Sequence, residues 1–193
     1  LKKKYNWNPV FMSGLRSDIS IIKQINKKYP SCIISDSIAL RQARFNYTGI
    51  GHTKPIDSEI LSSLSNHAFN YLSNLHDTSG NNFSYEERKS YYFDMLKYWN
   101  TVIINLKPEI FISYVIPHTP VCRSLYYLCK YHYNIKVLFI NHTPLLNKNF
   151  HVIGSSTDEL YQPFLKNYKS EKNLKIGSDA KIYLDSIRNK NAE

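Results

Sequence analysis

The stretch KPEIFISYVIPHTPVCRSLYYLCKYHYNIKVLFINHTPL (residues 107–145) decides how this chain is expected to fold. It contains two runs of apolar and aromatic residues, and each run stops at a His-Thr-Pro. The run after Pro108 is nearly all apolar, which is typical of a strand covered on both faces. Residues 118–134 then show apolar residues at helical spacing, with Pro120 in the first turn and with an expected inner face of Val121, Leu125, Leu128 and Cys129. Because a second apolar run follows at 135–140, the order strand, helix, strand predicts parallel pairing with a right-handed crossover.

The N-terminal part of the chain has the same order. NPVFMSG (8–14) is a short apolar run that predicts a buried strand. A helix is predicted over 17–30, with Ser17 as its N-cap, and CIISDS (32–37) is a second strand that ends near Asp36. These segments indicate the opening of a β-α-β unit.

Two helices are expected between these regions. Residues 38–54 lack a regular pattern and predict a surface loop, after which 56–75 regains helical spacing. Ile60, Leu64, Ala68 and Leu72 fall one turn apart, with Leu61 and Leu75 beside them. Ser84 and Glu87 form a capping box at the start of a long helix over 85–106. The apolar and aromatic face of that helix is expected to lie in the core: Tyr92, Met95, Leu96, Trp99, Ile103 and Leu106.

The C-terminal part is less regular. After Asn141 the pattern predicts a loop, with a short strand at 150–153 and helical segments beyond it. We therefore expect a Rossmann-like α/β domain over 1–150, with an open, mainly parallel sheet flanked by helices. Residues 151–193 are expected to form a loop and helical segment that leads toward a second domain. The chain begins with Leu rather than Met, which favours part of a longer protein.

Composition narrows the function classes. The chain has 193 residues, of which 42% are hydrophobic and 21% charged, an ordinary globular mix. No apolar run is long enough to span a membrane, and the basic N-terminus lacks the apolar segment of a signal peptide. The net charge of +10 is scattered among acidic residues without a nucleic-acid-binding pattern, so no nucleic-acid partner is expected. Three cysteines without a Cys-x-x-Cys pair predict buried thiols in a reducing compartment.

Polar residues at the strand ends are the candidate catalytic groups. In an open parallel sheet, ligands bind beyond the carboxyl ends of the strands. His118 and His142 each follow a predicted strand, and Asp36 ends another. If these strands are neighbours, we expect the two imidazoles and the carboxylate to share one rim, where a general base can act. The neighbouring polar side chains are the candidate substrate-binding groups: Thr119, Asn141 and Thr143.

Arg123 is a further candidate for binding an anionic substrate. It lies in the first turn of the helix after the first His-Thr-Pro, where free backbone amides favour anions. Its guanidinium can hold a carboxylate or a phosphate with two hydrogen bonds. The structural alternative is a solvated helix residue.

Structural explanations for the other candidates also stay open. Proline and threonine are common at strand ends and helix caps, and a histidine there often bonds only a neighbouring carbonyl. Metal binding by His118, His142 and Asp36 is another alternative, although no short-range ligand spacing favours it. The chain lacks the Gly-x-Ser-x-Gly of a serine hydrolase, a P-loop and the Gly-x-Gly-x-x-Gly of a dinucleotide site.

Three segments of the chain resemble a known family. They are YNWNPVFMSG (5–14), KYPSCIISDS (28–37) and SYEERKSYYFDMLKYWNTVIINLKPEIFISYVIPHTPVCRSLYYLCKYHYNIKVLFINHTPL (84–145). They are similar to the N-terminal region of bacterial capsule-polysaccharide-type, glycosyltransferase-like proteins. The shared pattern is a long aromatic helix, a Lys-Pro-acid-apolar strand, a Pro-His, a helix and an Ile-Lys-apolar strand. Its most specific element here is Pro117-His118.

This resemblance covers about residues 10–150 and implies a GT-B-like protein of two Rossmann-like domains, of which this chain is the N-terminal, acceptor-side half. It implies sugar transfer in surface polysaccharide biosynthesis, from a nucleotide-sugar substrate to a glycan or a lipid-linked acceptor, without a resident cofactor. It also implies a cytoplasmic location, including the inner face of the membrane. The base is then expected to be His118 or His142, with Asp36 orienting or replacing it, while Arg123 offsets diphosphate charge.

Two other functions are compatible with the same residues. A non-catalytic α/β module can scaffold an assembly or bind a glycan, and the 16 Tyr, 9 Phe and 2 Trp suit stacking against sugars. A sugar-nucleotide epimerase-like enzyme of similar architecture is the third interpretation. A second β-α-β domain in the downstream sequence would favour transfer, whereas a coiled coil or a stop codon there would favour the scaffold.

Overall fold

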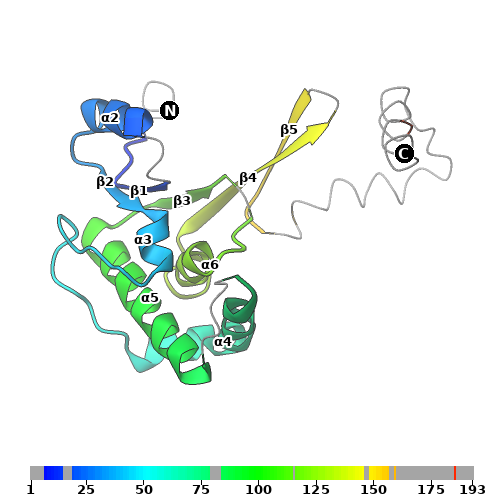
Figure 1. The fold of residues 1–193 in the computed structure, drawn as a ribbon. Coiled ribbons are helices and arrows are strands. Elements are labelled where there is room, and N and C mark those ends of the chain that lie inside the picture. The colour runs from blue at the N-terminus through cyan, green and yellow to red at the C-terminus, as the bar shows by residue number, and fades with distance from the viewer. Residues whose placement is uncertain are drawn as a thin grey trace. The chain divides into compact units, whose positions relative to one another are not determined.

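The computed structural model describes residues 7–14, 19–78, 84–114, 116–145 and 148–156, together with Glu159 and Asp185. The chain divides into two compact units. The first consists of Leu1–Phe111 and Pro117–Lys136, and the second of Ile112–Ile116 and Val137–Glu193. Figure 1 labels their helices and strands.

The first unit opens with a parallel β-α-β unit, which confirms the prediction for this part of the chain. Strand β1 (Phe11–Gly14) pairs in parallel with β2 (Ile33–Asp36), and helix α2 (Ile19–Lys28) lies between them in the chain. The predicted N-cap of this helix, Ser17, lies outside the described residues.

The prediction that β1 is buried is wrong. Met12 is 37% exposed, and Ser13 and Gly14 are exposed as well. Phe11 is the residue of this strand that packs inward, with its ring edge-on to the Trp99 ring at a centroid distance of 5.5 Å. A short apolar run therefore marks the strand correctly, but a run of this length does not say how many of its residues are covered.

Helix α3 (Ser37–Arg41) follows β2 directly, at a place where the sequence pattern predicts a loop. The Asp36 carboxylate begins this helix by accepting a hydrogen bond of 2.9 Å from the Ile38 N–H. A five-residue helix is too short for hydrophobic spacing to reveal it, which explains the difference. The irregular backbone predicted beyond it is confirmed for residues 42–54 and continues to residue 57.

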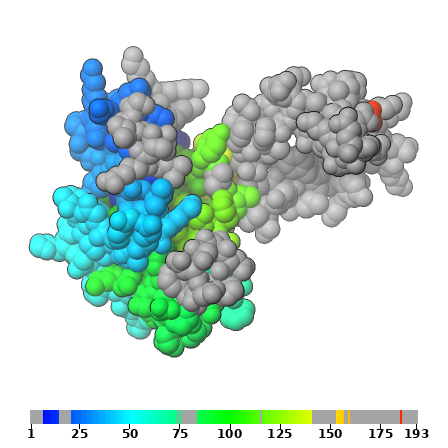
Figure 2. Space-filling model, in the orientation of Figure 1, coloured from blue at the N-terminus to red at the C-terminus, as the bar shows by residue number. Residues whose placement is uncertain are grey.

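Helix α5 (Tyr85–Leu106) anchors this irregular segment through polar side chains. Three hydrogen bonds join them: Thr101 Oγ1 accepts from Lys54 N–H at 2.9 Å, Asn100 Nδ2 donates to Pro55 O at 2.7 Å, and Asn105 Nδ2 donates to His52 O at 2.9 Å. These bonds explain why polar Asn100 and Thr101 can be buried in a core helix. Figure 2 shows the cyan surface of the segment beside the green surface that includes α5.

Helix α5 is also the centre of the hydrophobic core. Its predicted capping box is present, because Ser84 Oγ accepts from Glu87 N–H at 3.3 Å and Ser84 N–H donates to the Glu87 carboxylate at 2.8 Å. The helix ends at Lys107, which adopts a left-handed conformation. Five of the six predicted core residues are buried, and Leu106 is half-buried: Tyr92, Met95, Leu96, Trp99 and Ile103.

Helix α4 (Ser58–Thr78) packs against α5 and is confirmed, but its buried stripe differs from the prediction. Ile60, Leu64 and Leu75 of the expected set are fully buried together with Tyr71, whereas Ala68 and Leu72 are half-buried. A spacing of four residues at every step drifts around a helix that turns by about 100° per residue, so Leu72 lies about 120° from Ile60. Tyr71 lies only about 20° from Ile60 and therefore reaches the core.

Helix α6 (Pro120–Tyr127) continues into a π-helical turn, η1 (Leu128–His132). Together they confirm the helix predicted after the first His-Thr-Pro, with Pro120 at its N-terminus. Both elements contact α4 and α5, and Figure 1 shows the three helices grouped together. Val121, Leu128 and Cys129 are buried as predicted, whereas Leu125 is half-buried.

The second unit contains most of a three-stranded sheet. Its strand order is β3 (Ile110–Ser113), β4 (Lys136–Leu145) and β5 (Lys148–Gly154), so the two strands of the opening stretch are neighbours as expected. Strand β3 is less covered than predicted, because Ile112 is 37% exposed.

The second His-Thr-Pro does not end its strand, which corrects the loop prediction. Strand β4 runs through residues 142–144 and pairs antiparallel with β5, with His142 opposite His151 and Pro144 opposite Asn149. The predicted strand at 150–153 is confirmed as part of β5. An antiparallel partner allows the backbone to stay extended here, and the fixed φ of proline is compatible with that conformation.

These elements make the chain mixed α/β, with a two-stranded and a three-stranded sheet and with helices among the described residues. None of the described helices is both long and apolar enough to cross a membrane. The domain boundary expected near residue 150 stays a prediction.

Candidate functional site

The segment that leads into α6 presents His118. The side chain of His118 is exposed, whereas Pro117 and Pro120 on either side are buried. Thr119 Oγ1 accepts from the Cys122 N–H at 3.5 Å and so caps α6. This arrangement places an imidazole at the surface, on a backbone that is fixed by its neighbours.

Arg123 lies in the first turn of α6, where its backbone N–H donates to Thr119 O at 2.9 Å. Its side chain is half-buried, and its positive charge acts on the hydroxyl groups of Tyr71 and Tyr127. Burial raises the pKa of both tyrosines, and the Arg123 charge partly opposes that rise. Arg123 is therefore part of the packing between α4 and α6 as well as a candidate anion ligand.

Asp36 has a structural role that the sequence did not reveal. Its carboxylate is the N-cap of α3, as described above. Capping engages a carboxylate oxygen without excluding other contacts, because an ionised carboxylate has about four acceptor sites. The catalytic role of Asp36 stays a prediction.

The remaining predicted residues lie in β4. The backbone of Asn141, His142 and Thr143 is extended and pairs with β5, while the positions of their side chains lie outside the described structure. His118 and His142 belong to different units. The shared rim expected for the two imidazoles therefore stays a prediction, as do the roles of Asn141 and Thr143.

An aromatic cluster that the sequence did not single out lies between α4 and the end of α6. The His67 ring stacks on Tyr127 at a centroid distance of 4.6 Å and on Tyr131 at 4.1 Å. Lys130 Nζ lies 5.5 Å from the centroid of Tyr126 and 5.8 Å from that of Tyr131. Burial lowers the pKa of His67, so neutral imidazole is favoured in this stack.

The π-helical turn next to this cluster has its own polar contact with α4. Ser63 Oγ and His132 Nδ1 are 3.2 Å apart. A π-turn inserts a residue into a helix and is often found near functional sites, because it redirects the side chains that follow. Here it places Lys130, Tyr131 and His132 against or beside α4.

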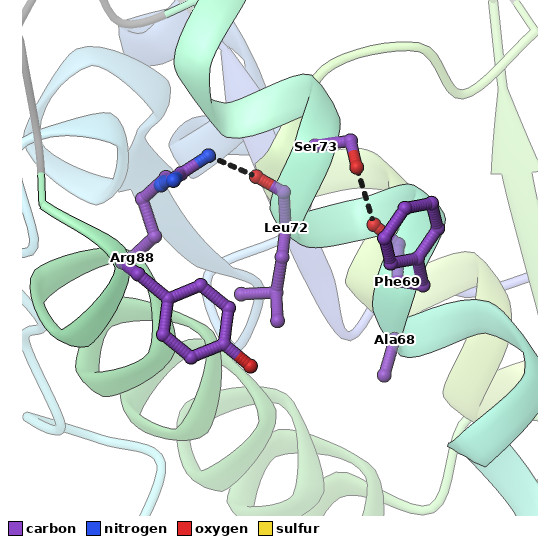
Figure 3. A pocket seen from close by; sticks show the side chains of 6 residues that line it. Ala68, Phe69, Leu72, Ser73 and Arg88 are labelled. Carbon is purple, nitrogen blue, oxygen red and sulfur yellow. Dashed lines mark hydrogen bonds between the residues drawn. The ribbon is translucent and has the colours of Figure 1, made fainter.

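A pocket of about 300 Å³ lies between α4 and the first turn of α5 (Figure 3). It is lined by Ala68, Phe69, Leu72, Ser73, Tyr85 and Arg88. Phe69 is 78% exposed and Tyr85 is 55% exposed, so both rings are accessible to solvent. Figure 3 shows Arg88 and Phe69 on either side of Leu72.

Arg88 supplies the charge of this pocket. Its Nη1 donates to the backbone oxygen of Leu72 at 3.2 Å, while its Nε is buried and has no hydrogen-bond partner among the described residues. Of the carboxylates that the structure describes near it, Glu86 pairs with Lys89 at 4.0 Å and Glu87 accepts from Ser84. The guanidinium of Arg88 thus lacks an acidic partner in the described part of the chain.

Sequence reasoning missed this pocket for a physical reason. Phe69 lies about 180° from Ile60 around α4, on the side away from the core, and the sequence alone does not show what stands there. The available signal was an aromatic residue opposite the buried stripe of an amphipathic helix. Arg88 is hidden in the mixed-charge run EERK (86–89), which is typical of a solvated helix start.

No group of three or more His, Cys, Asp or Glu side chains in the described part of the chain has a geometry that could hold a metal ion. The scan against protein-family models found no match, and the searches of curated proteins and of solved structures found none either. The function is therefore inferred from residues and geometry.

Proposed function

We propose that this chain is the acceptor-side part of a bacterial capsule-polysaccharide-type sugar transferase. In this proposal it is the N-terminal half of a GT-B-like protein, whose Rossmann-like sheet extends the small sheets described above. The observation that carries the proposal is His118, an exposed imidazole just before α6, whose first turn contains Arg123. A base beside a helix N-terminus suits sugar transfer from a nucleoside-diphosphate sugar, because the reaction needs a proton acceptor and the positive end of the helix dipole favours the leaving diphosphate.

The proposed reaction is transfer with inversion at the anomeric carbon. The acceptor hydroxyl attacks that carbon, the bond between the carbon and the diphosphate oxygen breaks, and the hydroxyl proton moves to the imidazole of His118. The leaving diphosphate takes the electron pair, and the Arg123 guanidinium offsets its charge, together with the positive end of the α6 dipole. His142 is the alternative base, with Asp36 orienting or replacing it, and Thr119, Asn141 and Thr143 are proposed to bind the substrates.

The donor in this proposal is a nucleotide-sugar that acts as a substrate, and the acceptor is a glycan or a lipid-linked glycan. Such an acceptor places the reaction in the cytoplasm at the inner face of the membrane. The net charge of +10 supports this arrangement, because anionic lipid head groups and diphosphates attract a basic protein.

The test is release of nucleoside diphosphate by the full-length protein, given a panel of nucleotide-sugars and detergent-solubilised lipid-linked acceptors. We expect the variant His118→Ala to lose at least about 100-fold in rate, the usual contribution of a general base. His52→Ala is the matched control, because His52 is another exposed histidine of the same unit. If His118→Ala transfers sugar as fast as the parent protein, the role of this residue is refuted.

A non-catalytic glycan-binding module is the second candidate function. The accessible rings of Phe69 and Tyr85 favour it, because exposed aromatic faces are suited to stacking against sugar rings. Under this alternative the protein binds glycans but releases no nucleoside diphosphate from any donor in the presence of acceptor. The same assay therefore separates the two candidates.

A further inference from the structure

The pocket between α4 and α5 combines three properties of a binding site. It is concave, it has accessible aromatic rings at Phe69 and Tyr85, and it contains the guanidinium of Arg88. Its volume of about 300 Å³ is at the lower end of the range for small-molecule sites. That size suits a single sugar ring better than a whole nucleotide-sugar.

The chemistry of Arg88 indicates an anionic ligand. Its buried Nε has no partner among the described residues, and a buried donor without an acceptor is unfavourable. Because Glu86 and Glu87 have other partners in the described structure, the positive charge of the guanidinium is not offset there by a carboxylate, and an oxyanion bound in the pocket would offset it. A guanidinium can hold a carboxylate or a phosphate with two parallel hydrogen bonds from its two terminal nitrogens.

The aromatic residues indicate a ring-shaped ligand. The face of an aromatic ring is electron-rich, and the C–H groups of a pyranose carry a small positive charge that suits this face. Phe69 has no polar group, whereas the Tyr85 hydroxyl can donate or accept a hydrogen bond. The Ser73 hydroxyl is already used in a bond of 2.9 Å to Phe69 O, which fixes this part of the pocket wall.

We propose that this pocket binds an anionic pyranose unit of a saccharide. Arg88 pairs with its carboxylate or phosphate group, and the sugar ring lies against Phe69 and Tyr85. That the ligand is a saccharide rests on the proposed function. The new element is that the saccharide acceptor carries a negative charge.

The experiment is an NMR titration of the ¹⁵N-labelled protein with D-glucuronate, glucose 1-phosphate and D-glucose in separate arms. We expect shifts of the amide signals of 68–73 and 85–88, with a Kd at least tenfold lower for an anionic ligand than for glucose. Comparison of the titrations with glucuronate and with glucose 1-phosphate shows whether the pocket prefers a sugar carboxylate or a sugar phosphate. Equal affinity for glucose, shifts confined to other residues, or no shifts at all would each overturn the proposal.

Variants separate this pocket from a general effect of charge. Arg88→Gln is expected to weaken binding of the anionic ligand at least tenfold and to leave glucose binding unchanged, whereas Lys97→Gln, on the exposed side of the same helix, changes neither. Phe69→Ala is expected to weaken the binding of all three ligands. Ile21→Ala is the control and should leave binding unchanged, because Ile21 is also exposed, at 52%, but does not line the pocket. Arg88→Lys retains the charge but not the two-pronged geometry, and intermediate binding is expected.

Thermal unfolding of each variant confirms that the fold is retained. Because the titration requires no turnover, its outcome is independent of the transferase assay. Ligand binding in the pocket without release of diphosphate would support the pocket proposal and contradict the transferase proposal. Release of diphosphate without binding in the pocket would support the transferase proposal and contradict the pocket proposal. An Arg88→Gln variant that is folded and binds the anionic sugar like the parent would refute the role of Arg88.

Discussion

The indole Nε1–H of Trp99 donates a hydrogen bond of 2.9 Å to the backbone oxygen of Val121. Trp99 is 1% exposed and lies in the middle of α5, while Val121 is in the first turn of α6. The hydroxyl of Ser124 donates to the same oxygen at 3.0 Å. This buried bond therefore joins the core helix α5 to the first turn of α6. It thereby helps to fix the position of the backbone that carries the exposed His118.

Replacing Trp99 by Phe removes this donor and leaves a small cavity. We expect the variant to lose about 2 kcal/mol of unfolding free energy, because Ser124 still satisfies the Val121 oxygen in part. Urea unfolding followed by circular dichroism measures the change. Trp7→Phe is the control, since Trp7 is only half-buried, and equal losses in both variants would contradict the expected role.

The polar bridge at Asn100 gives a second stability prediction. Asn100 Nδ2 donates to Pro55 O at 2.7 Å, and its Oδ1 accepts from the Tyr133 hydroxyl. We expect Asn100→Ala to cost about 2–3 kcal/mol, because it leaves the Pro55 oxygen without this donor. A double-mutant cycle with Tyr133→Phe should give a coupling of about 1 kcal/mol, and strictly additive effects would argue against the bridge.

Gly51 is predicted to be intolerant of a side chain. Its φ of +108° is strained for other residues, and an added Cβ would lie 3.1 Å from Asn105 Nδ2, which is held by its bond to His52 O. We expect Gly51→Ala to be destabilised by more than about 1 kcal/mol. Gly14→Ala is the matched control, because nothing lies within 4 Å of its added Cβ. Equal unfolding midpoints for the two variants would show the prediction to be wrong.

The three cysteines are predicted to react with a thiol reagent at different rates. Cys129 is 1% exposed and burial raises its pKa to about 12, while burial also raises the pKa of Cys32. Because the thiolate is the reactive form, both should be protected in the native protein at pH 8. Cys122 is half-buried and should react first. Mass spectrometry after brief labelling identifies the site, and early labelling of Cys129 would be inconsistent with the packing of η1.

Alkaline pH is predicted to destabilise the protein through buried tyrosines. Burial raises the pKa of Tyr92 from 10.0 to about 12. The folded state then holds the phenolic proton more tightly than the unfolded state, so this contribution is complete below pH 10 and is lost as pH rises toward 12. Chemical unfolding at a series of pH values measures it. Tyr92→Phe should show a smaller loss between pH 10 and 12, and an unchanged slope would contradict this assignment.

Local signals predicted most of the elements. The Ser84–Glu87 capping box marked the start of α5 because its two hydrogen bonds depend only on residues three apart. The buried stripe of α4 was predicted less well, since a choice between Leu72 and Tyr71 depends on the rotation of the whole helix. The continuation of β4 through His142 depends on its pairing with β5, which no local pattern contains.

The candidate site was predictable only in part, for a related reason. The strand-end rule gave His118 as a candidate, and its side chain is exposed just before α6, although β3 ends at Ser113 and not at the His-Thr-Pro. Asp36 was assigned by the same rule, but the structure shows it as a helix cap because α3 begins at once after β2. The pocket at Arg88 arises from two helices that lie side by side, and that juxtaposition is a property of the packed core.

The tripeptide His-Thr-Pro lies in two different secondary structures within one molecule. At 118–120 Thr119 caps α6 and Pro120 begins the helix, whereas at 142–144 the tripeptide lies inside an antiparallel pair of strands. Its conformation is thus dictated by what surrounds it, so the three letters are a poor probe for distant homologues. A search profile that includes the residues around the first copy, with Pro117 before it, would select chains that share the backbone geometry as well as the tripeptide sequence.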